Sequence, residues 1–313
     1  MSTNLNFYIL NQEREGDSLE NGQIRKALSG FYYVYDNGRL VRGRGRGVFR
    51  NRGVTPLVGD FVDYEVDGDN DAVIVNIHER KNELVRPPIS NVDQALLVFS
   101  MKEPDFSPRL LNRFLAIIES YGVEPVICLT KADLLDGKDA ERLRPYVDYY
   151  RKIGYPVIET HIGDEKVAET LLPLLEGKTT VLTGQSGVGK STLLNSLMPD
   201  LDLKTDEISD ALGRGRHTTR HVELIEYGGG LVADTPGFSS LDFDHLEKED
   251  LTHCFIEFAE LAEQCKFRGC LHLKEPKCAV KAAVEKGDAA RFRYDDYVLF
   301  LQEIIDRKPR YPS

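Results

Sequence analysis

The stretch that decides the fold is Gly184-Gln-Ser-Gly-Val-Gly-Lys-Ser191. It follows the β-type run Thr179-Thr-Val-Leu-Thr183 and opens a helical pattern over 192–197. A strand, the pattern G-x-x-x-x-G-K-[ST] and then a helix are typical of a phosphate-binding loop. The backbone N–H groups of such a loop surround phosphates, and the helix N-terminus adds positive potential. The sequence therefore predicts a nucleotide site here.

The residue types in this loop predict individual roles. We expect Lys190 to contact the β- and γ-phosphates and Ser191 to bind Mg²⁺. The residues expected to contact the nucleotide are Gly184, Gln185, Ser186, Gly187, Val188, Gly189, Lys190, Ser191 and Thr192. A glycine-rich turn without a ligand is the alternative, and the flanking strand and helix count against it.

A second motif lies downstream, where Gly230-Leu-Val-Ala-Asp234 ends in Asp234-Thr-Pro-Gly237. In phosphate-loop enzymes an Asp at a strand end holds Mg²⁺, usually through water. The Gly237 amide would sense the γ-phosphate. A plain turn is the alternative.

A third motif lies upstream, where Val126-Ile-Cys-Leu-Thr130-Lys-Ala-Asp133 places T-K-x-D after a strand. The Asp133 carboxylate can accept two hydrogen bonds from the N1–H and amino group of guanine. Adenine offers no such pair of donors, so the predicted nucleotide is GTP. We expect Thr130 and Lys131 to complete the motif, with the Lys131 stem on the base plane. T-K-x-D alone is a weak signal, but it gains weight beside the other two motifs.

The order of the motifs is informative. GTPases of the usual topology run from the phosphate loop through D-x-x-G to T-K-x-D, whereas here the base-reading motif comes first. The sequence therefore predicts a circular permutation, which preserves a sheet when the old termini are close. The permutation also leads the chain from Gly237 directly into the C-terminal region, so movement of a switch could pass to that region.

Three regions follow one another along the chain. Up to about residue 78, short β-type runs alternate with turn signals such as Asp36-Asn-Gly38, which predicts a small barrel. The middle region alternates strands and helices and predicts a mostly parallel, doubly wound α/β sheet. Its buried strands are expected at 94–100, 125–129, 155–158, 179–183 and 230–234, with a helix at 110–121. From about residue 246 the pattern is helical.

A cysteine and histidine cluster interrupts this last region. Cys265-x4-Cys270-x-His272-x5-Cys278 offers three thiolates and one imidazole, a full tetrahedral set for one structural Zn²⁺. No ligand position stays open for water, so catalysis at the metal is not expected. Scattered buried cysteines are the alternative, and Cys128 and Cys254 are expected in the core.

Composition narrows the class of protein. The chain has 313 residues, a net charge of −11 and five cysteines. Clustered cysteines in a cytosolic chain favour metal over disulfides. No apolar run approaches the ~18 residues that span a bilayer, and the N-terminus lacks the pattern of a secretory signal. We expect a cytoplasmic protein of two or three domains with no membrane partner.

The order of the motifs, followed by the Cys/His cluster, resembles the ribosome small-subunit-dependent GTPase A family over nearly the whole chain. Gly59-Asp60 and the stretch 86–93 share the resemblance. It implies an OB-fold at 1–78, a circularly permuted GTPase domain at 79–245 and a mainly helical zinc-binding domain at 246–313. It further implies a GTP phosphohydrolase in late maturation of the small ribosomal subunit, which stimulates its turnover. GTP, GDP, the subunit and its rRNA are the implied partners, and we expect a monomer.

The stretch Gly213-Arg-Gly-Arg-His217-Thr-Thr219 resembles the first switch of that family. The resemblance implies Thr219 on Mg²⁺ and His217 as the catalytic residue that positions water. Phe238 stands where most small GTPases carry the Gln that orients water, and Arg220 replaces what is commonly a third Thr. A solvated loop histidine is the alternative for His217.

A basic strip runs through the first region. Its arginines alternate along an extended strand, which would place them on one face, and OB-folds bind nucleic acid with such surfaces. The resemblance favours rRNA as the ligand, and a charged edge strand protected from aggregation is the alternative. The residues expected to bind RNA are Arg42, Arg44, Arg46, Arg50 and Arg52.

Two other functions remain open at this point. One is a GTP-regulated RNA-binding module with negligible hydrolysis, which Phe238 favours. The other is an ATP-driven RNA remodelling enzyme, which Asp133 disfavours. Measuring phosphate release with and without ribosomal subunits would distinguish the RNA-binding module from a GTPase. Competition by ATP for labelled GTP would test the ATP-driven enzyme.

Overall fold

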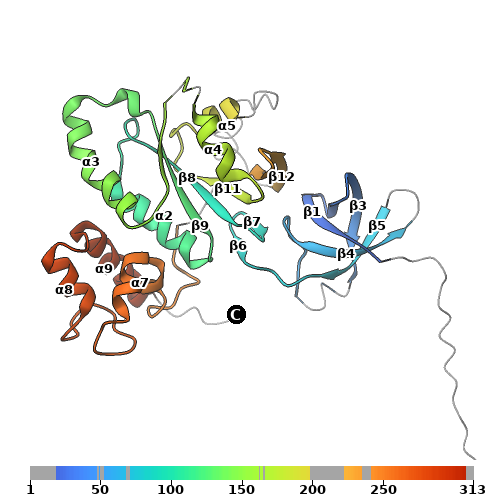
Figure 1. Ribbon diagram of the computed structural model, residues 1–313. Coiled ribbons are helices and arrows are strands. Elements are labelled where there is room, and N and C mark those ends of the chain that lie inside the picture. The colour runs from blue at the N-terminus through green and yellow to red at the C-terminus, as the bar shows by residue number, and fades with distance from the viewer. Residues whose placement is uncertain are drawn as a thin grey trace, which may run out of the picture.

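The protein is described by a computed structural model at residues 19–47, 49, 53–67, 71–161, 163–164, 166–197, 222–234 and 241–307. Within these residues a β-barrel is followed by an α/β sheet with helices on both faces and then by a helical C-terminal region (Figure 1). The predicted succession of barrel, α/β region and helical region is confirmed.

Five strands form the barrel: β1 (Glu20–Leu28), β2 (Phe31–Asp36), β3 (Arg39–Gly45), β4 (Phe61–Asp67) and β5 (Asp71–Ile77). They run in the order β1-β2-β3-β5-β4, and β4 pairs back with β1, so the sheet closes. Only β3 and β5 pair in parallel within this ring. The β2–β3 turn has positive φ at Asn37 and Gly38, as the Asn-Gly signal predicts.

The chain leaves the barrel through a short hairpin of β6 (Glu83–Val85) and β7 (Pro88–Ser90). Asp60, whose side chain is 0% exposed, accepts hydrogen bonds from Arg80 Nε at 2.7 Å and Ser90 Oγ at 2.6 Å. At Gly59 a Cβ would lie 2.0 Å from the Ser90 carbonyl oxygen. Gly59, Asp60, Arg80 and Ser90 form what we call the barrel joint, which fixes the exit of the chain from the barrel.

Six strands form the second sheet: β8 (Gln94–Ser100), β9 (Glu124–Thr130), β10 (Val157–Glu159), β11 (Thr179–Thr183), β12 (Val222–Tyr227) and β13 (Gly230–Asp234). Their order is β10-β9-β8-β11-β13-β12, and every pair is parallel except β13 with β12. The mostly parallel sheet is confirmed, whereas β12 was not anticipated from the sequence.

Helices cover both faces of this sheet. α2 (Pro108–Ser120) and α3 (Gly137–Lys152) share a core with Leu97 and Phe99 of β8. α4 (Val167–Leu175) and α5 (Lys190–Leu197) share another with the alternate residues Leu96 and Val98. Because successive strand residues point to opposite faces, an apolar strand such as β8 serves both layers. The doubly wound architecture is confirmed.

The barrel and the second sheet meet along one narrow edge. Strand β1 pairs antiparallel with β12 at Lys26 with Glu223 and at Ala27 with Val222. The Lys26 ammonium and the Glu223 carboxylate lie 2.6 Å apart across this contact. We call this pairing the seam, and it makes the two sheets one continuous sheet of 11 strands.

The C-terminal region contains η3 (Leu251–Cys254), α7 (Ile256–Ala262), α8 (Ala279–Lys286) and α9 (Arg291–Asp306). Its aromatic core, which includes Phe255, Phe258 and Tyr297, packs against Ala116 and Ile117 of α2. Helix α2 therefore has two buried faces, one toward the sheet and one toward the C-terminal region.

Two cysteines, Cys128 and Cys254, lie outside the Cys/His cluster. Cys128 in β9 and Cys254 in η3 are buried, as predicted. In the part of the chain that the structure describes, no helix combines the length and the apolar character needed to cross a membrane.

Candidate nucleotide and metal sites

The sequence motifs gather at one edge of the second sheet. Because β8, β9, β11 and β13 run parallel, their carboxyl ends lie at the same edge. In open α/β sheets this edge forms the crevice that holds ligands. T-K-x-D begins at the end of β9, the phosphate loop follows β11, and Asp234 ends β13.

The loop between β11 and α5 depends on its glycines. Gly184, Gly187 and Gly189 have φ values of 148°, 78° and 94°, a region that residues with a side chain rarely adopt. At Gly184 a Cβ would lie 2.0 Å from the carbonyl oxygen of Val98 in β8. The glycines therefore let the loop turn tightly over the sheet edge, as a phosphate-binding loop requires.

Lys190 is the first residue of α5 and folds back over the loop. Its Nζ donates hydrogen bonds to the carbonyl oxygens of Gly184 at 2.9 Å and Gln185 at 2.5 Å. Burial lowers the pKa of this ammonium group. Among the described residues no carboxylate forms an ion pair with Lys190. A partly buried cation whose described partners are carbonyl groups suits an incoming polyphosphate.

Two residues of T-K-x-D contact the phosphate loop directly. Thr130 Oγ1 donates to the carbonyl oxygen of Val188 at 2.5 Å. Lys131 Nζ donates to the carbonyl oxygen of Gly187 at 2.9 Å and also to that of Glu103. The structure thus brings together two motifs that lie more than fifty positions apart in the chain.

Asp133 lies in the short helix η1 (Ala132–Leu134) and is exposed to solvent. The preceding Ala132 N–H donates to the carbonyl oxygen of Thr160 at 3.2 Å, just after β10. The exposed Asp133 carboxylate is therefore accessible to a base bound beside the phosphate loop. Its contact with guanine stays a prediction.

Sequence reasoning missed Glu103 and Thr160, which support T-K-x-D through their carbonyl oxygens. Both follow strands of the same parallel sheet, β8 and β10, at its carboxyl edge. Their position after a strand could have predicted this role, because every loop at the carboxyl edge of a doubly wound sheet faces the same crevice.

Several predicted residues fall outside the described part of the chain. These are His217, Thr219, Gly237, Arg50, Arg52 and the side chain of Asp234. Ser191 and Thr192 lie in the first turn of α5 and are half-buried. The Mg²⁺ set of Ser191, Thr219 and Asp234 therefore stays a prediction.

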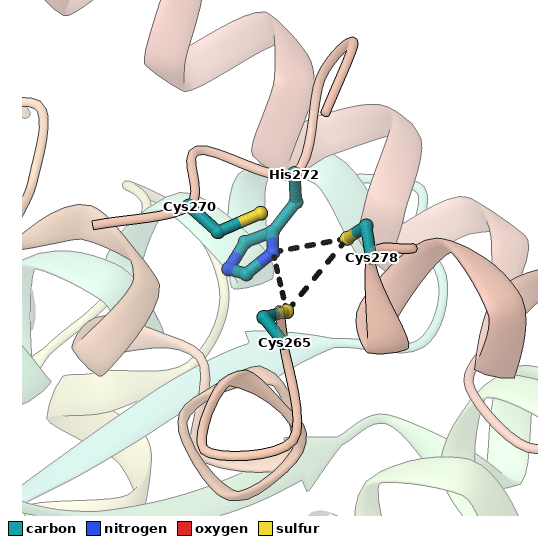
Figure 2. A group of neighbouring side chains, drawn as sticks. All are labelled: Cys265, Cys270, His272 and Cys278. Atoms are coloured by element: carbon teal, nitrogen blue, oxygen red, sulfur yellow. Dashed lines mark hydrogen bonds between the residues drawn. The ribbon is translucent and has the colours of Figure 1, made fainter. Parts of the chain in front are cut away.

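The four predicted zinc ligands converge in the C-terminal region (Figure 2). His272 Nδ1 lies 3.3 Å from Cys278 Sγ and 3.7 Å from Cys265 Sγ, and the two sulfurs lie 4.0 Å apart. The ligand atoms of Cys265, Cys270, His272 and Cys278 all lie within 4.8 Å of one another. Tetrahedral Zn²⁺ with bonds of about 2.3 Å requires neighbouring sulfurs roughly 3.8 Å apart, so the spacing fits such an ion.

The surroundings of this cluster also suit a cation. Burial raises the pKa of Cys270 to about 12 and raises the pKa of Cys278. The backbone N–H groups of Ala279 and Lys281 donate to the sulfurs of Cys265 and Cys278, which favours thiolates. Tyr294 on α9 donates to the His272 carbonyl oxygen at 2.7 Å and anchors the loop. A divalent ion would supply the positive charge that keeps buried thiolates stable.

The basic strip follows β3, as predicted, with Arg42, Arg44 and Arg46 exposed on alternate residues. Strand β3 is hydrogen-bonded to β2 and β5, so it is not an edge strand. Arg42 pairs with Asp71 at 2.6 Å and Arg46 with Glu65 at 2.9 Å. The positive charge of the strip is thus partly balanced by neighbouring strands, which the sequence of the strip alone could not show.

Comparison with known proteins follows the same division of the chain. A family model described as RsgA GTPase matches residues 77–244, which is more than half of the chain. A model described as RsgA N-terminal domain matches residues 21–74. The chain belongs to the RsgA GTPase family. It is accordingly a GTP-hydrolysing enzyme that binds GTP and GDP, as the three motifs predict.

Members of the family resemble this chain over nearly its full length. The Small ribosomal subunit biogenesis GTPase RsgA of Bacillus cereus is 57% identical over 290 residues, covering 93% of this chain and 99% of the relative. The protein of the same name from Bacillus subtilis is 55% identical over 295 residues, with the same coverage.

Two crystal structures of the family share the fold. YloQ, described as a circularly permuted GTPase, superposes with a TM-score of 0.81 at 49% identity, covering 96% of this chain and 100% of YloQ. YjeQ from Thermotoga maritima gives a TM-score of 0.82 at 36% identity, covering 93% and 100%. The circular permutation predicted from the order of the motifs is confirmed.

Proposed function

We propose that this GTPase acts on the small ribosomal subunit during its late maturation and hydrolyses GTP faster when bound to the subunit. The observation that carries the GTPase part of the proposal is the contact of Thr130 and Lys131 with the phosphate loop, because it joins the T-K-x-D motif and the loop in one site. The names of the relatives support the small subunit as the partner.

The loop amides and Lys190 would hold the phosphates of GTP, and Asp133 would accept hydrogen bonds from guanine. Ser191, Thr219 and Asp234 supply the hard oxygen ligands that Mg²⁺ prefers. When bound, Mg²⁺ neutralises the developing negative charge on the phosphates. Phe238 carries no hydrogen-bonding group, so we assign the positioning of the attacking water to His217.

We assign RNA binding to the barrel at 1–78, GTP hydrolysis to 79–245 and one structural Zn²⁺ to the region 246–313. The exposed arginines of β3 support contact with rRNA. We infer that the protein acts as a cytoplasmic monomer. GTP would favour the ribosome-bound state and hydrolysis would release the protein, as in other nucleotide switches.

An RNA-binding module with negligible hydrolysis is the second candidate, because Phe238 leaves the usual water-orienting position without a polar group. The deciding experiment measures phosphate release from GTP with and without purified small ribosomal subunits. We expect stimulation by subunits, a shift toward xanthosine triphosphate in Asp133→Asn and loss of stimulated turnover in His217→Ala. Equal rates with and without subunits would refute the proposed partner.

The zinc assignment has its own measurement. Elemental analysis of the purified protein should find one zinc ion per chain, and Cys265→Ser should lose it. Cys254→Ser is the matched control, because Cys254 is a free cysteine of the same region that lies outside the cluster. Zinc in the Cys265→Ser variant at the full amount would contradict the assignment.

A further inference from the structure

A cavity of about 410 Å³ lies between the barrel and the second sheet, next to the seam. Its wall includes Arg25 of β1 and Phe61 of β4 on the barrel side. Lys81 and Asp93 come from the connecting segment, and Lys178 and Glu226 from the second sheet and its loops. The cavity also touches Thr179 and Gly230, the first residues of β11 and β13, so it lies at the opposite edge of the sheet from the phosphate loop.

Arg25 enters this cavity because β1 has a bulge. The pairing of β1 with β2 shifts between Ile24, opposite Val34, and Lys26, opposite Tyr33, which leaves Arg25 as the extra residue. Such bulges redirect a side chain and are enriched next to binding sites. The bulge thus gives Arg25 a direction that regular alternation along the strand would not give.

The Arg25 side chain lacks a matching anion. Its guanidinium lies over the Tyr35 ring at 4.7 Å, and its Nε is buried with no hydrogen-bond partner among the described residues. Within the described ranges no carboxylate lies at ion-pair distance from it, and Glu226 acts only as a more distant charge. Buried donors are almost always satisfied, so this unsatisfied donor on a cation is available to an anionic ligand.

Phe61 supplies an aromatic face to the same cavity. Its side chain is 49% exposed, although it begins a strand of a closed barrel. Exposed aromatic rings that lie beside cations form the stacking platforms with which proteins hold unpaired bases. An anion-seeking arginine and an open ring in one cavity therefore match a nucleotide, with its phosphate and its base.

Among the other charged residues of the wall, Lys81, Asp93 and Lys178 already have partners. Asp93 accepts from Lys81 Nζ at 3.0 Å and from the Thr179 N–H at 2.8 Å. Lys178 pairs with Glu124 at 2.7 Å. Among the described residues of the wall, Arg25 is therefore the cation without an ion pair.

We propose that this cavity binds one unpaired nucleotide of RNA, with the phosphate at Arg25 and the base stacked on Phe61. The proposal rests on the proposed RNA-binding function and adds a contact site to it. The volume lies within the ~300–1,000 Å³ of typical ligand sites. Since the wall comes from both the barrel and the second sheet, an RNA strand held here would bridge them beside the seam.

The test measures fluorescence anisotropy of a labelled, mixed-sequence single-stranded RNA of twelve nucleotides with the full chain saturated in GDP. Stacking on an aromatic ring and a phosphate contact predict about tenfold weaker binding in Phe61→Leu and in Arg25→Gln. Phe61→Tyr should bind as the wild type does. Thermal unfolding of each variant verifies that it is folded.

Phe267→Leu is the matched control, because Phe267 is a similarly exposed ring that lies outside the cavity. Uridine monophosphate tests the other source of a nucleotide, and we expect it not to displace the RNA at equal nucleotide concentration. Full displacement would assign the cavity to free nucleotides and overturn the proposal.

A photo-crosslinking experiment locates the contact. The same RNA with 4-thiouridine should crosslink to peptides that contain Phe61. Unchanged binding in Arg25→Gln and Phe61→Leu, equal weakening in Phe267→Leu, or no RNA binding by the wild type would each overturn the proposal. Stimulation of GTP hydrolysis by small subunits would still support the proposed function in those cases, so the two can fail separately.

Discussion

The second sheet contacts its two neighbours in opposite ways. At the C-terminal region, α2 buries a second face in an aromatic core, and a network of buried polar groups crosses the interface. Arg293 of α9 donates to both carboxylate oxygens of Glu257 at 2.8 Å and to Asn112 of α2 at 3.1 Å. At the barrel, the described residues make contact at the seam, the barrel joint and the wall of a cavity, and the apolar residues Val58, Ile89 and Val92 link the two cores.

From this difference we expect the α/β sheet and the C-terminal region to behave as one unit, and the barrel to be the part that moves. Interfaces that are small and polar allow relative motion of domains, whereas large apolar ones do not. A conformational change in the second sheet after GTP hydrolysis would therefore displace the C-terminal region with it. The same change would be transmitted to the barrel through fewer contacts. The predictions below test that contrast, beginning with the largest effect.

Replacement of Arg293 by Met should cost the most stability. The Arg293 side chain is 0% exposed, and its loss leaves the buried Glu257 carboxylate without its partner. Removing one member of a buried pair costs about 3–5 kcal/mol. Denaturant unfolding measures the change, and Arg142→Met, at an exposed pair with Asp139, is the control. A loss below about 1 kcal/mol would remove the basis for the contrast.

Replacement of Asp60 by Asn should weaken the barrel joint. The Asp60 carboxylate accepts hydrogen bonds from Arg80, Ser90 and the N–H of Leu57. Hydrogen bonds to charged groups contribute about 1.5–3 kcal/mol, and we expect a loss of about 2 kcal/mol. Hydrogen exchange should speed up in the barrel while the second sheet stays protected. Asp71→Asn, at the exposed pair with Arg42, should change little, and uniform exchange in both sheets would refute a separate barrel.

The Glu119 carboxyl in α2 gives the C-terminal interface a pH dependence. Burial raises its pKa to about 7, while Tyr155 donates a hydrogen bond to it at 3.0 Å. Because the folded state then holds a proton that the unfolded state has released, this contribution to stability is lost as the pH rises toward 7.

Replacement of Glu119 by Gln should flatten that dependence. We expect the variant to be about 3 kcal/mol more stable than the wild type at pH 8, from 1.36 kcal/mol per pKa unit, and similar to it at pH 5. Unfolding free energies measured across pH 5–8 test this. A wild-type profile that stays flat over this range would contradict the assignment.

The smallest effect is expected at the seam. Lys26 and Glu223 are both partly exposed, and such pairs contribute about 0.2–1 kcal/mol. Lys26→Glu and Glu223→Lys should each destabilise slightly, and the double variant should recover the loss. A double-mutant cycle of unfolding free energies gives the coupling. A coupling above about 2 kcal/mol would make the seam a strong interface and weaken the contrast.

Local patterns were sufficient to predict the nucleotide edge and the metal cluster. The roles of Gly184 and Lys190 follow from a motif whose physics is confined to one turn. The four predicted zinc ligands lie within fourteen positions of one another, so spacing alone predicted that they meet. The parallel order of strands followed because alternating strands and helices leave few topologies.

Contacts between distant parts of the chain could not be predicted in this way. Arg80 meets Asp60 only after the barrel has closed, and Arg293 meets Asn112 only after α9 has packed on α2. The apolar residues of α2 follow one helical pattern in the sequence, which does not show that they face two different cores. Likewise, β12 is short and half-buried, and its position in the sheet is set by its pairing with β13 and β1.

The two buried faces of α2 have a consequence for synthesis on the ribosome. The sheet-facing side of α2 can be covered as soon as β8 and β9 have emerged, but Ala116 and Ile117 stay uncovered until the core residues from Phe243 onward have emerged. Chains grow at about 5–20 residues per second, so the roughly 130 residues in between take on the order of 10 s. Throughout that interval the apolar residues Ala116 and Ile117 of α2 are exposed to solvent on the nascent chain. A chain that stops before Phe243 would keep these residues exposed permanently and would be prone to aggregate.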